Sequence, residues 1–417
     1  MFYHRLGVAS CLAITVAACA SDRITSGSAL DESRQVANGV SPSSAALMAN
    51  YVSIGTSVSM GWRSDGITGT EQAESWPALL AADVGVPFSV PSIQAPGCKP
   101  MLAAPLINFR RTDGSPALAD NRTCAPNEAG VTLPTHNLAV ENATAKEALN
   151  GTPETASQGR GPVTSRVLPS GMTQVSAMVA SHPTFVSVEF GGNELLPAQV
   201  GILVPGLTYT PFEQYRANLQ SIVDAVKGTG AGALIVSPRM DLRNFPTLRT
   251  SQEIAAQRVA FQAYNVRVAA DCDDSPNYIF VRGVVPKAIL TGAGLAPYGL
   301  QYTLSCNDVP GTQDFVLTPA NITFINDLIN QMSDEVDRHA AENGWATFAL
   351  GVLYDRSKDD VPFDLVSYLT SDEPYGHWIS LDGVHASSAG QKKLAQAARV
   401  AIQKTYGTGR ATVIAAR

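Results

Sequence analysis

The chain has 417 residues, of which 45% are hydrophobic and 16% are charged, and this is enough apolar material for one large core. The formal net charge is -7, and lysine and arginine are scattered along the chain. Because no basic stripe is present to meet a phosphate backbone, we expect a globular protein and no nucleic-acid partner.

Residues 1–19 have the pattern of a targeting segment. A weakly positive start is followed by a short apolar run that cannot span a bilayer as a helix. The segment ends in Val-Ala-Ala-Cys, which resembles the bacterial lipobox. That resemblance implies lipid attachment at Cys19 and, because Ala20 follows instead of Asp, an outer-membrane lipoprotein held by its acyl chains. A plain cleaved secretory signal is the alternative.

Residues 20–45 are rich in Ser, Ala and Gly and predict a flexible tether. From residue 46 to 410, short apolar runs alternate with helical patterns, which predicts one folded domain. The predicted strands are 51–54, 88–93, 185–190, 233–236, 278–281 and 345–350. The predicted helices are 74–84, 172–180, 212–227, 252–270, 322–336 and 388–403. This alternation favours an α/β fold, a three-layer α/β/α sandwich with a central, mostly parallel sheet.

Residues from 97 to about 165 interrupt the alternation. They hold many Pro and Gly residues and no long periodic stretch, so we expect an insertion over one end of the sheet that serves as a lid or binding surface. Some apolar residues here, together with Trp62, are candidates for an acyl pocket, although ordinary loop packing is the simpler explanation. They are Met101, Leu102, Leu106, Ile107 and Phe109.

Six cysteines are present, of which Cys11 lies in the targeting segment and Cys19 is the expected lipidation site. The others are Cys98, Cys124, Cys272 and Cys306. An even number in an oxidising compartment predicts disulfides, and of the three possible pairings the sequential one closes the shortest loops. A zinc site is the alternative, but no cysteine has a second ligand at the usual short spacing, so we expect no metal.

Two segments that follow predicted strands carry candidate catalytic groups. Gly-Thr-Ser-Val-Ser places Ser57 at the carboxyl end of the first strand, where open α/β sheets bind ligands. Gly-Gly-Asn-Glu follows the strand 185–190, and Asn193 can donate a side-chain N–H to an oxyanion. Each segment alone is better explained as an ordinary cap or turn.

A third segment, Asp382-Gly-Val-His385, precedes the last predicted helix. Three-residue spacing on a turn can bring the carboxylate against one imidazole nitrogen and leave the other free to take a serine proton. Among the six histidines, His385 alone has a carboxylate at this spacing within a Gly-containing turn. A surface turn with a capping Asp is the alternative.

Together these segments resemble the SGNH (GDSL-type) hydrolases, which have a Gly-Asp-Ser block, a block with a Gly, a Gly-x-Asn-Asp block and a late Asp-x-x-His block. The corresponding stretches here are GTSVS, QAPGCK, GGNE and DGVH, in the same order over residues 50 to 405. The resemblance implies Ser57 as nucleophile, His385 as general base and acid, and Asp382 as the residue that orients His385. It also implies an oxyanion hole from the backbone N–H groups of Ser57 and Gly97 and the side chain of Asn193.

The chain departs from the family pattern at two positions: Thr56 and Glu194 stand where the family has Asp. Neither position transfers a proton in the family, so we expect activity to survive, with an altered support for the nucleophile turn at Thr56.

The resemblance implies a serine esterase that acts on a small-molecule or lipid ester through an acyl-enzyme and needs no cofactor. Deacetylation of a surface polysaccharide is the second possibility, and a non-catalytic glycan-binding surface module is the third. A binding module has no need of Ser57, Asp382 and His385 together, which argues against the third.

Overall fold

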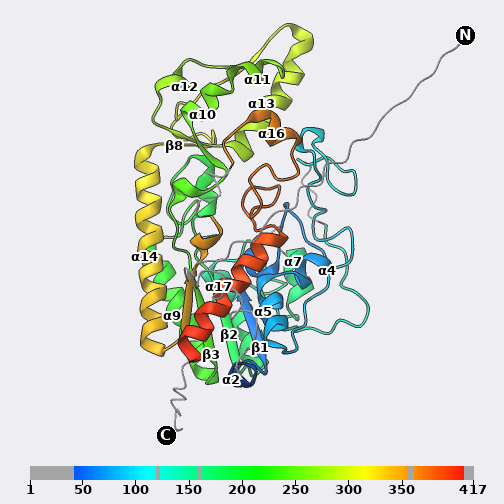
Figure 1. Ribbon diagram of the computed structural model, residues 1–417, viewed down its shortest axis with the longest axis vertical. Coiled ribbons are helices and arrows are strands. Elements are labelled where there is room, and N and C mark those ends of the chain that lie inside the picture. The colour runs from blue at the N-terminus through cyan, green and yellow to red at the C-terminus, as the bar shows by residue number, and fades with distance from the viewer. Residues whose placement is uncertain (1–41, 119–122, 157–160, 355–360, 408–417) are drawn as a thin grey trace, which may run out of the picture. The chain divides into compact units, whose positions relative to one another are not determined.

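The computed structural model describes residues 42–118, 123–156, 161–354 and 361–407 (Figure 1). The targeting segment, Cys19 and most of the predicted tether lie outside the described residues, so those predictions stay predictions. Within the described ranges, every helix is too short or too polar to cross a membrane.

A parallel sheet of four strands forms the centre of the fold, in the order β1-β2-β3-β9. The strands are β1 (Tyr51–Gly55), β2 (Phe185–Glu189), β3 (Gly232–Ser237) and β9 (Ala346–Ala349). At the carboxyl end of the first two strands, Gly55 pairs with Glu189. Every residue of β1 and β2 is buried, as expected for strands that are covered on both faces.

Two groups of helices cover this sheet. Those helices are α5 (Trp76–Val84) and α17 (Ser388–Tyr406) in one group, and α8 (Gln174–Ala180), α9 (Phe212–Thr229) and α14 (Pro319–Asn343) in the other. Figure 1 shows α17 crossing the strands, and it packs on α5 and β9. In the second group, α8 packs on β1, and α14 packs on β3 and α9. The predicted three-layer α/β/α sandwich with a central parallel sheet is therefore confirmed.

Amphipathic spacing explains why α9 lies on the core. Its buried residues recur at helical intervals and form one apolar stripe. They are Tyr215, Leu219, Ile222, Val223 and Val226. The last helix, α17, begins after Ser387, whose hydroxyl accepts a hydrogen bond from Gly390 N at 3.1 Å. This cap fixes the start of α17 directly after the turn that carries His385.

Two small sheets lie outside the central one. They are β4 (Leu248–Thr250), β6 (Tyr278–Phe280) and β8 (Val316–Leu317), which are antiparallel, and β5 (Val266–Val268) with β7 (Tyr302–Leu304), which are parallel. The strand predicted at 278–281 therefore exists, but it joins a separate sheet. The helix predicted at 252–270 forms only in its first part, as α10 (Ser251–Ala256) and α11 (Arg258–Gln262). The rest is not helical, because Asn265 has a left-handed φ of 57° and β5 follows it.

The strand predicted at 88–93 is also wrong, because Pro91 lacks the N–H that a ladder requires and Ser92 has a φ of 49°. The place beside β1 belongs to residues 136–140. Leu138 N donates to Ser53 O at 2.8 Å, and Val140 N donates to Gly55 O at 3.1 Å, in a parallel arrangement. Part of the predicted insertion is thus paired with the core sheet.

The remaining helices are mostly short. The α-helices are α2 (Pro42–Leu47), α3 (Ser57–Met60), α4 (Gly69–Ala73), α6 (Ala145–Asn150), α7 (Gly161–Val167), α12 (Asp271–Asp274), α13 (Val281–Leu295) and α16 (Leu365–Thr370). The 3-10 helices are η1 (Leu106–Asn108), η2 (Leu196–Val200), η3 (Leu242–Asn244), η4 (Ala296–Tyr298) and η5 (Leu350–Leu353).

The four cysteines that follow the targeting segment form two disulfides, Cys98–Cys124 and Cys272–Cys306, so the sequential pairing is confirmed. Within the described residues, one group of potential metal ligands joins Asp271 to the second disulfide. Because both of its sulfur atoms are bonded to each other, this group is a covalent cross-link with a neighbouring carboxylate.

Candidate active site

The structure brings Ser57, His385 and Asp382 into one hydrogen-bonded chain, although Ser57 and His385 are 328 residues apart. Ser57 begins α3 directly after β1. Its Oγ lies 2.8 Å from His385 Nε2, and His385 Nδ1 lies 2.9 Å from Asp382 Oδ2. Because a carboxylate can only accept, Nδ1 carries the ring proton, and Nε2 accepts from the serine hydroxyl. The arrangement can therefore move a proton from Ser57 to His385.

Asp382 is buried and accepts hydrogen bonds from several N–H groups. Its Oδ1 accepts from Val384 N at 2.8 Å and His385 N at 2.9 Å, and its Oδ2 accepts from Asp65 N at 2.7 Å. Burial alone would raise the pKa of this carboxyl, but the charge and hydrogen bond of His385 and the charge of Arg282 outweigh it, and the pKa lies well below its usual range. Asp382 is therefore ionised at neutral pH and holds the orientation of His385.

A tight turn after α3 supplies the N–H that reaches Asp382. Ser64 and Asp65 have φ values of 48° and 56°, in the left-handed region that side chains rarely adopt. The carboxylate of Asp65 is held by Lys99 at 2.7 Å and by the buried Arg111 at 2.6 Å. Both cations come from the loop between residues 97 and 124, so this loop is linked through Asp65 to the carboxylate of the triad.

A second buried carboxylate, Glu189 at the end of β2, supports the nucleophile turn. It accepts hydrogen bonds from Thr56 N at 3.0 Å, from Thr56 Oγ1 at 2.7 Å and from Ser59 Oγ at 3.1 Å. Burial raises the pKa of Glu189, and these hydrogen bonds oppose that rise. Thr56, which stands where the family has Asp, thus takes its carboxylate partner from the neighbouring strand.

Glu194, the other departure from the family pattern, ties two backbone segments together. Its Oε1 accepts from Ala145 N at 2.7 Å, and its Oε2 accepts from Gly191 N at 2.9 Å. Burial, as the largest cause, raises the pKa of Glu194 to about 7 against these hydrogen bonds. The side chain fixes the Gly191–Asn193 turn against the start of α6.

The two other predicted oxyanion residues, Asn193 and Gly97, have different surroundings. Asn193 Nδ2 donates to Ala143 O at 2.9 Å. Gly97, with a φ of 106°, packs on the backbone of Ile67, whose carbonyl oxygen would lie 2.2 Å from an added Cβ. Its carbonyl accepts from Ala125 N at 3.1 Å. Gly97 therefore permits a close approach of two backbone segments, and its predicted oxyanion role has no support in this geometry.

Residues 141–143 follow the segment that pairs with β1, so they emerge at the same edge of the sheet as Ser57. Asn142 has a left-handed φ of 57°, and Ala143 O contacts Asn193 as described above. The buried run Leu138-Ala139-Val140 is the signal that could have located this segment, but it is too short to distinguish a strand from a loop.

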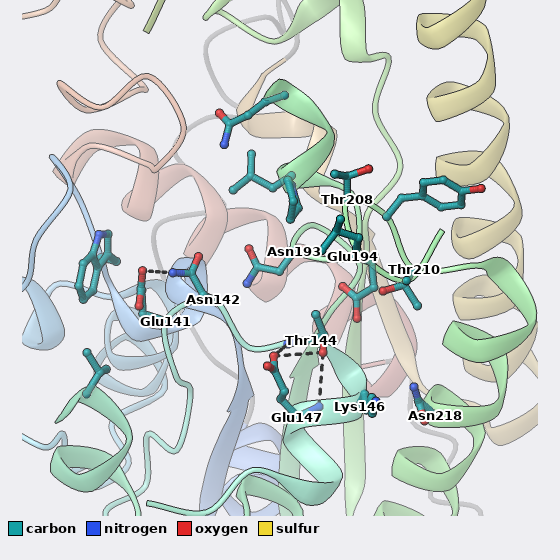
Figure 2. A pocket seen from close by; sticks show the side chains of 18 of the residues that line it. Glu141, Asn142, Thr144, Lys146, Glu147, Asn193, Glu194, Thr208, Thr210 and Asn218 are labelled. Carbon is teal, nitrogen blue, oxygen red and sulfur yellow. Dashed lines mark hydrogen bonds between the residues drawn. The ribbon is translucent and has the colours of Figure 1, made fainter. Parts of the chain in front are cut away.

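A cavity of about 700 Å³ opens at this edge of the sheet (Figure 2). Asn142 and Asn193 line it, together with Trp62 from the chain after α3. Ser57 and His385 are not among the residues that line this cavity, but the segments before Asn142 and Asn193 flank β1, which Ser57 follows. The cavity therefore lies at the same edge of the sheet as the triad and is the candidate space for part of the substrate.

A smaller cavity of about 140 Å³ includes Asp382 in its wall. Leu102, Leu106 and Phe109 of the predicted acyl-pocket residues line this second cavity. Trp62 lines the large cavity instead. Met101 and Ile107 line neither cavity, so the predicted residues do not form one acyl pocket.

No protein-family model and no curated protein matches the chain. Among solved structures, it is similar to an acetylxylan esterase from Geobacillus stearothermophilus, with 12% identity and a TM-score of 0.35 over 83% of this chain and 90% of that chain. For a psychrotrophic esterase from Pseudoalteromonas sp., the identity is 10% and the TM-score 0.35 over 85% and 97%. For an extracellular lipase from Streptomyces rimosus, the values are 13% and 0.34 over 84% and 98%. These neighbours are esterases and a lipase, as the SGNH-type motifs led us to expect, but at these TM-scores they do not assign a function.

Proposed function

We propose that the protein is a serine esterase that hydrolyses carboxylic esters through an acyl-enzyme on Ser57. The observation that carries the proposal is the chain of hydrogen bonds from Ser57 Oγ to His385 Nε2 at 2.8 Å and from His385 Nδ1 to Asp382 Oδ2 at 2.9 Å. A serine hydroxyl next to one imidazole nitrogen, with a buried carboxylate on the other nitrogen, is the arrangement that activates a serine for acyl transfer.

The reaction follows from these contacts. Ser57 Oγ attacks the ester carbonyl carbon while its proton passes to His385 Nε2. The tetrahedral intermediate collapses, the C–O bond to the alcohol breaks, and the alcohol takes the proton from Nε2. A water molecule then attacks the acyl-enzyme and gives a proton to Nε2, and collapse releases the acid and returns this proton to Ser57. Asp382 remains ionised and stabilises the imidazolium that forms twice in the cycle.

Three N–H donors can stabilise the oxyanion of this intermediate. The first is the backbone N–H of Ser57 at the start of α3. The second is the backbone N–H of Asn142, which replaces the predicted Gly97 because residues 141–143 follow the segment beside β1. The third is Asn193 Nδ2, which has two N–H groups and uses one on Ala143 O. Removal of one such donor costs on the order of a hundredfold in kcat.

Esters with different acyl groups fit the same reaction. Lipid esters and short-chain esters both fit the proposed chemistry, as does deacetylation of a polysaccharide. A glycan-binding module without activity is the competing class. The buried Asp382 and its four N–H contacts favour catalysis, since glycan binding alone gives no reason to hold a histidine on a serine.

The test is hydrolysis of p-nitrophenyl acetate, butyrate and palmitate by the full-length protein in a mild detergent. Ser57→Ala should reduce kcat by a factor of at least about 10⁴, with an unchanged circular dichroism spectrum. Ser221→Ala, an exposed serine on α9, serves as the control and should retain full activity. Turnover that persists in Ser57→Ala would show that another nucleophile acts. A wild-type protein that is folded but inactive on every ester would favour the binding module.

We further propose that the protein is a lipoprotein anchored in the bacterial outer membrane through Cys19. The supporting observation is the Val-Ala-Ala-Cys sequence after an apolar run. Metabolic labelling with a radioactive fatty acid tests this proposal. Label should enter the wild-type chain and sediment with outer membranes, and it should be absent from Cys19→Ser. Equal labelling of the two proteins would contradict the anchor.

A further inference from the structure

The 700 Å³ cavity has a wall that is unusual for a site that holds hydrocarbon. Ligand cavities are lined mainly by apolar side chains with a few polar groups. Here most lining residues carry amide, hydroxyl or charged side chains, and Figure 2 shows Asn142, Thr144, Asn193, Thr210 and Asn218 among them. A long alkyl chain in this space would remove water from polar groups without replacing their hydrogen bonds, so the wall disfavours it.

Three amide side chains of this wall are available for a ligand. Gln214 and Asn218 lie four residues apart on α9 and therefore share one face of the helix. Gln199 lines the same cavity from η2. Within the parts of the chain that the structure describes, these three side chains make no hydrogen bond. An amide offers both donors and an acceptor, which suits a hydroxyl group that also does both.

One aromatic residue adds to this wall. Tyr209 is half-buried and lines the same cavity, whereas Trp62, also in the wall, is only 3% exposed. A sugar ring carries hydroxyl groups around its rim and C–H groups on its faces, so it can use amide and aromatic groups together. By contrast, the apolar cavity next to Gly191 and Gly192 has a volume of only about 50 Å³, which is too small for a long alkyl chain.

We propose that the polar cavity is the subsite for the alcohol part of the ester and that this alcohol is a sugar. The substrate is then a saccharide that carries a short O-acyl group, and Gln214 and Asn218 of α9 determine the preference for it. This inference rests on the proposed esterase activity, because it assigns the alcohol that leaves when Ser57 is acylated.

The experiment compares kcat/KM of the full-length protein on three acetates: a monoacetylated methyl glycoside, octyl acetate and p-nitrophenyl acetate. Wild-type protein should prefer the glycoside to octyl acetate by at least about tenfold. In the variant Gln214→Leu/Asn218→Leu, two hydrogen bonds to the sugar are lost. At roughly fivefold for each neutral hydrogen bond, kcat/KM on the glycoside should fall about 25-fold. Hydrolysis of p-nitrophenyl acetate should fall by a clearly smaller factor, because its aryl group also enters this subsite but has no hydroxyl groups that bond to these amides.

Gln220→Leu is the matched control, because Gln220 lies on α9, does not line the cavity and bonds to Asp224. It should leave all three rates unchanged. A preference of the wild-type protein for octyl acetate would overturn the proposal, as would an equal loss on the glycoside and p-nitrophenyl acetate in the double variant. Both results would leave the esterase itself intact, whereas turnover by Ser57→Ala would refute the esterase mechanism separately.

Discussion

Replacing Asp382 with asparagine tests whether this carboxylate fixes the proton on His385. In the native site, Oδ1 faces the N–H groups of Val384 and His385, and Oδ2 faces Asp65 N and His385 Nδ1. The single carbonyl oxygen of the introduced amide would turn toward the two N–H groups of its own turn, which places the NH₂ group against His385 Nδ1. That nitrogen must then accept, so the ring proton moves to Nε2, which can no longer take a proton from Ser57.

The magnitude follows from the loss of the active tautomer. A triad with an intact geometry but the wrong tautomer loses roughly 10⁴ in kcat, or about 5 kcal/mol of barrier. The variant also leaves Asp65 N–H facing an NH₂ group, and an unsatisfied buried donor costs about 1–3 kcal/mol of unfolding free energy. We therefore expect a large loss of kcat, little change in KM and a moderate loss of stability.

The assay is steady-state hydrolysis of p-nitrophenyl acetate between pH 6 and 9, with urea unfolding of the same preparations. Glu373→Gln is the control, since Glu373 pairs with His377 Nδ1 at 3.0 Å in an exposed position away from Ser57. It should retain full activity and stability. A kcat in Asp382→Asn above about a tenth of the wild-type value would refute the claim that Asp382 sets the tautomer.

The remaining predictions concern buried charges around the site. Glu189→Gln removes one carboxylate oxygen that accepts hydrogen bonds from Thr56. We expect the free energy of unfolding to fall by about 1–3 kcal/mol in urea titrations, and kcat to fall roughly tenfold to a hundredfold. Arg111→Met removes one cation from Asp65, and kcat should fall more than KM changes, whereas a change in KM alone would contradict a link to the triad. Burial raises the pKa of Glu194 from 4.5 to about 7, so the folded state binds its proton more tightly, and unfolding free energy should decrease by about 3 kcal/mol as pH rises from below 4.5 to above 7. A Glu194→Gln variant should lack this decrease in urea titrations at pH 4.5 to 8.

The fold was predictable where local pattern and tertiary context agree. The strands at 51–54 and 185–190 and the helix at 212–227 have the periodicity of the structure they adopt, and their positions are confirmed by β1, β2 and α9. The run 88–93 contains apolar residues, but Pro91 prevents it from forming the hydrogen bonds of a strand. By contrast, residues 136–140 pair with β1 although their apolar run has only three residues. Strand pairing over a long loop is decided by contacts that no local pattern contains.

The candidate site also contains residues that the sequence predicted and contacts that it did not. Ser57, Asp382, His385 and Asn193 were identified from motifs that follow particular strands and turns, and the structure places the first three in hydrogen-bonding contact. Gly97 was assigned from the order of the family's blocks, and the strand predicted before it at 88–93 does not form. Hydrogen bonds that hold the triad in place, such as the one from Asp65 N to Asp382, cannot be predicted from a motif. They depend on backbone groups that meet only in the folded chain.

Covalent labelling of the nucleophile tests the central claim most directly. The full-length protein would be treated with a fluorophosphonate ester, digested, and analysed by mass spectrometry to locate the adduct. We predict one adduct on Ser57 that forms in parallel with loss of p-nitrophenyl acetate hydrolysis and is absent from Ser57→Ala. An adduct on a different serine, or complete inactivation with Ser57 unmodified, would contradict the assignment of Ser57 as the nucleophile that His385 activates.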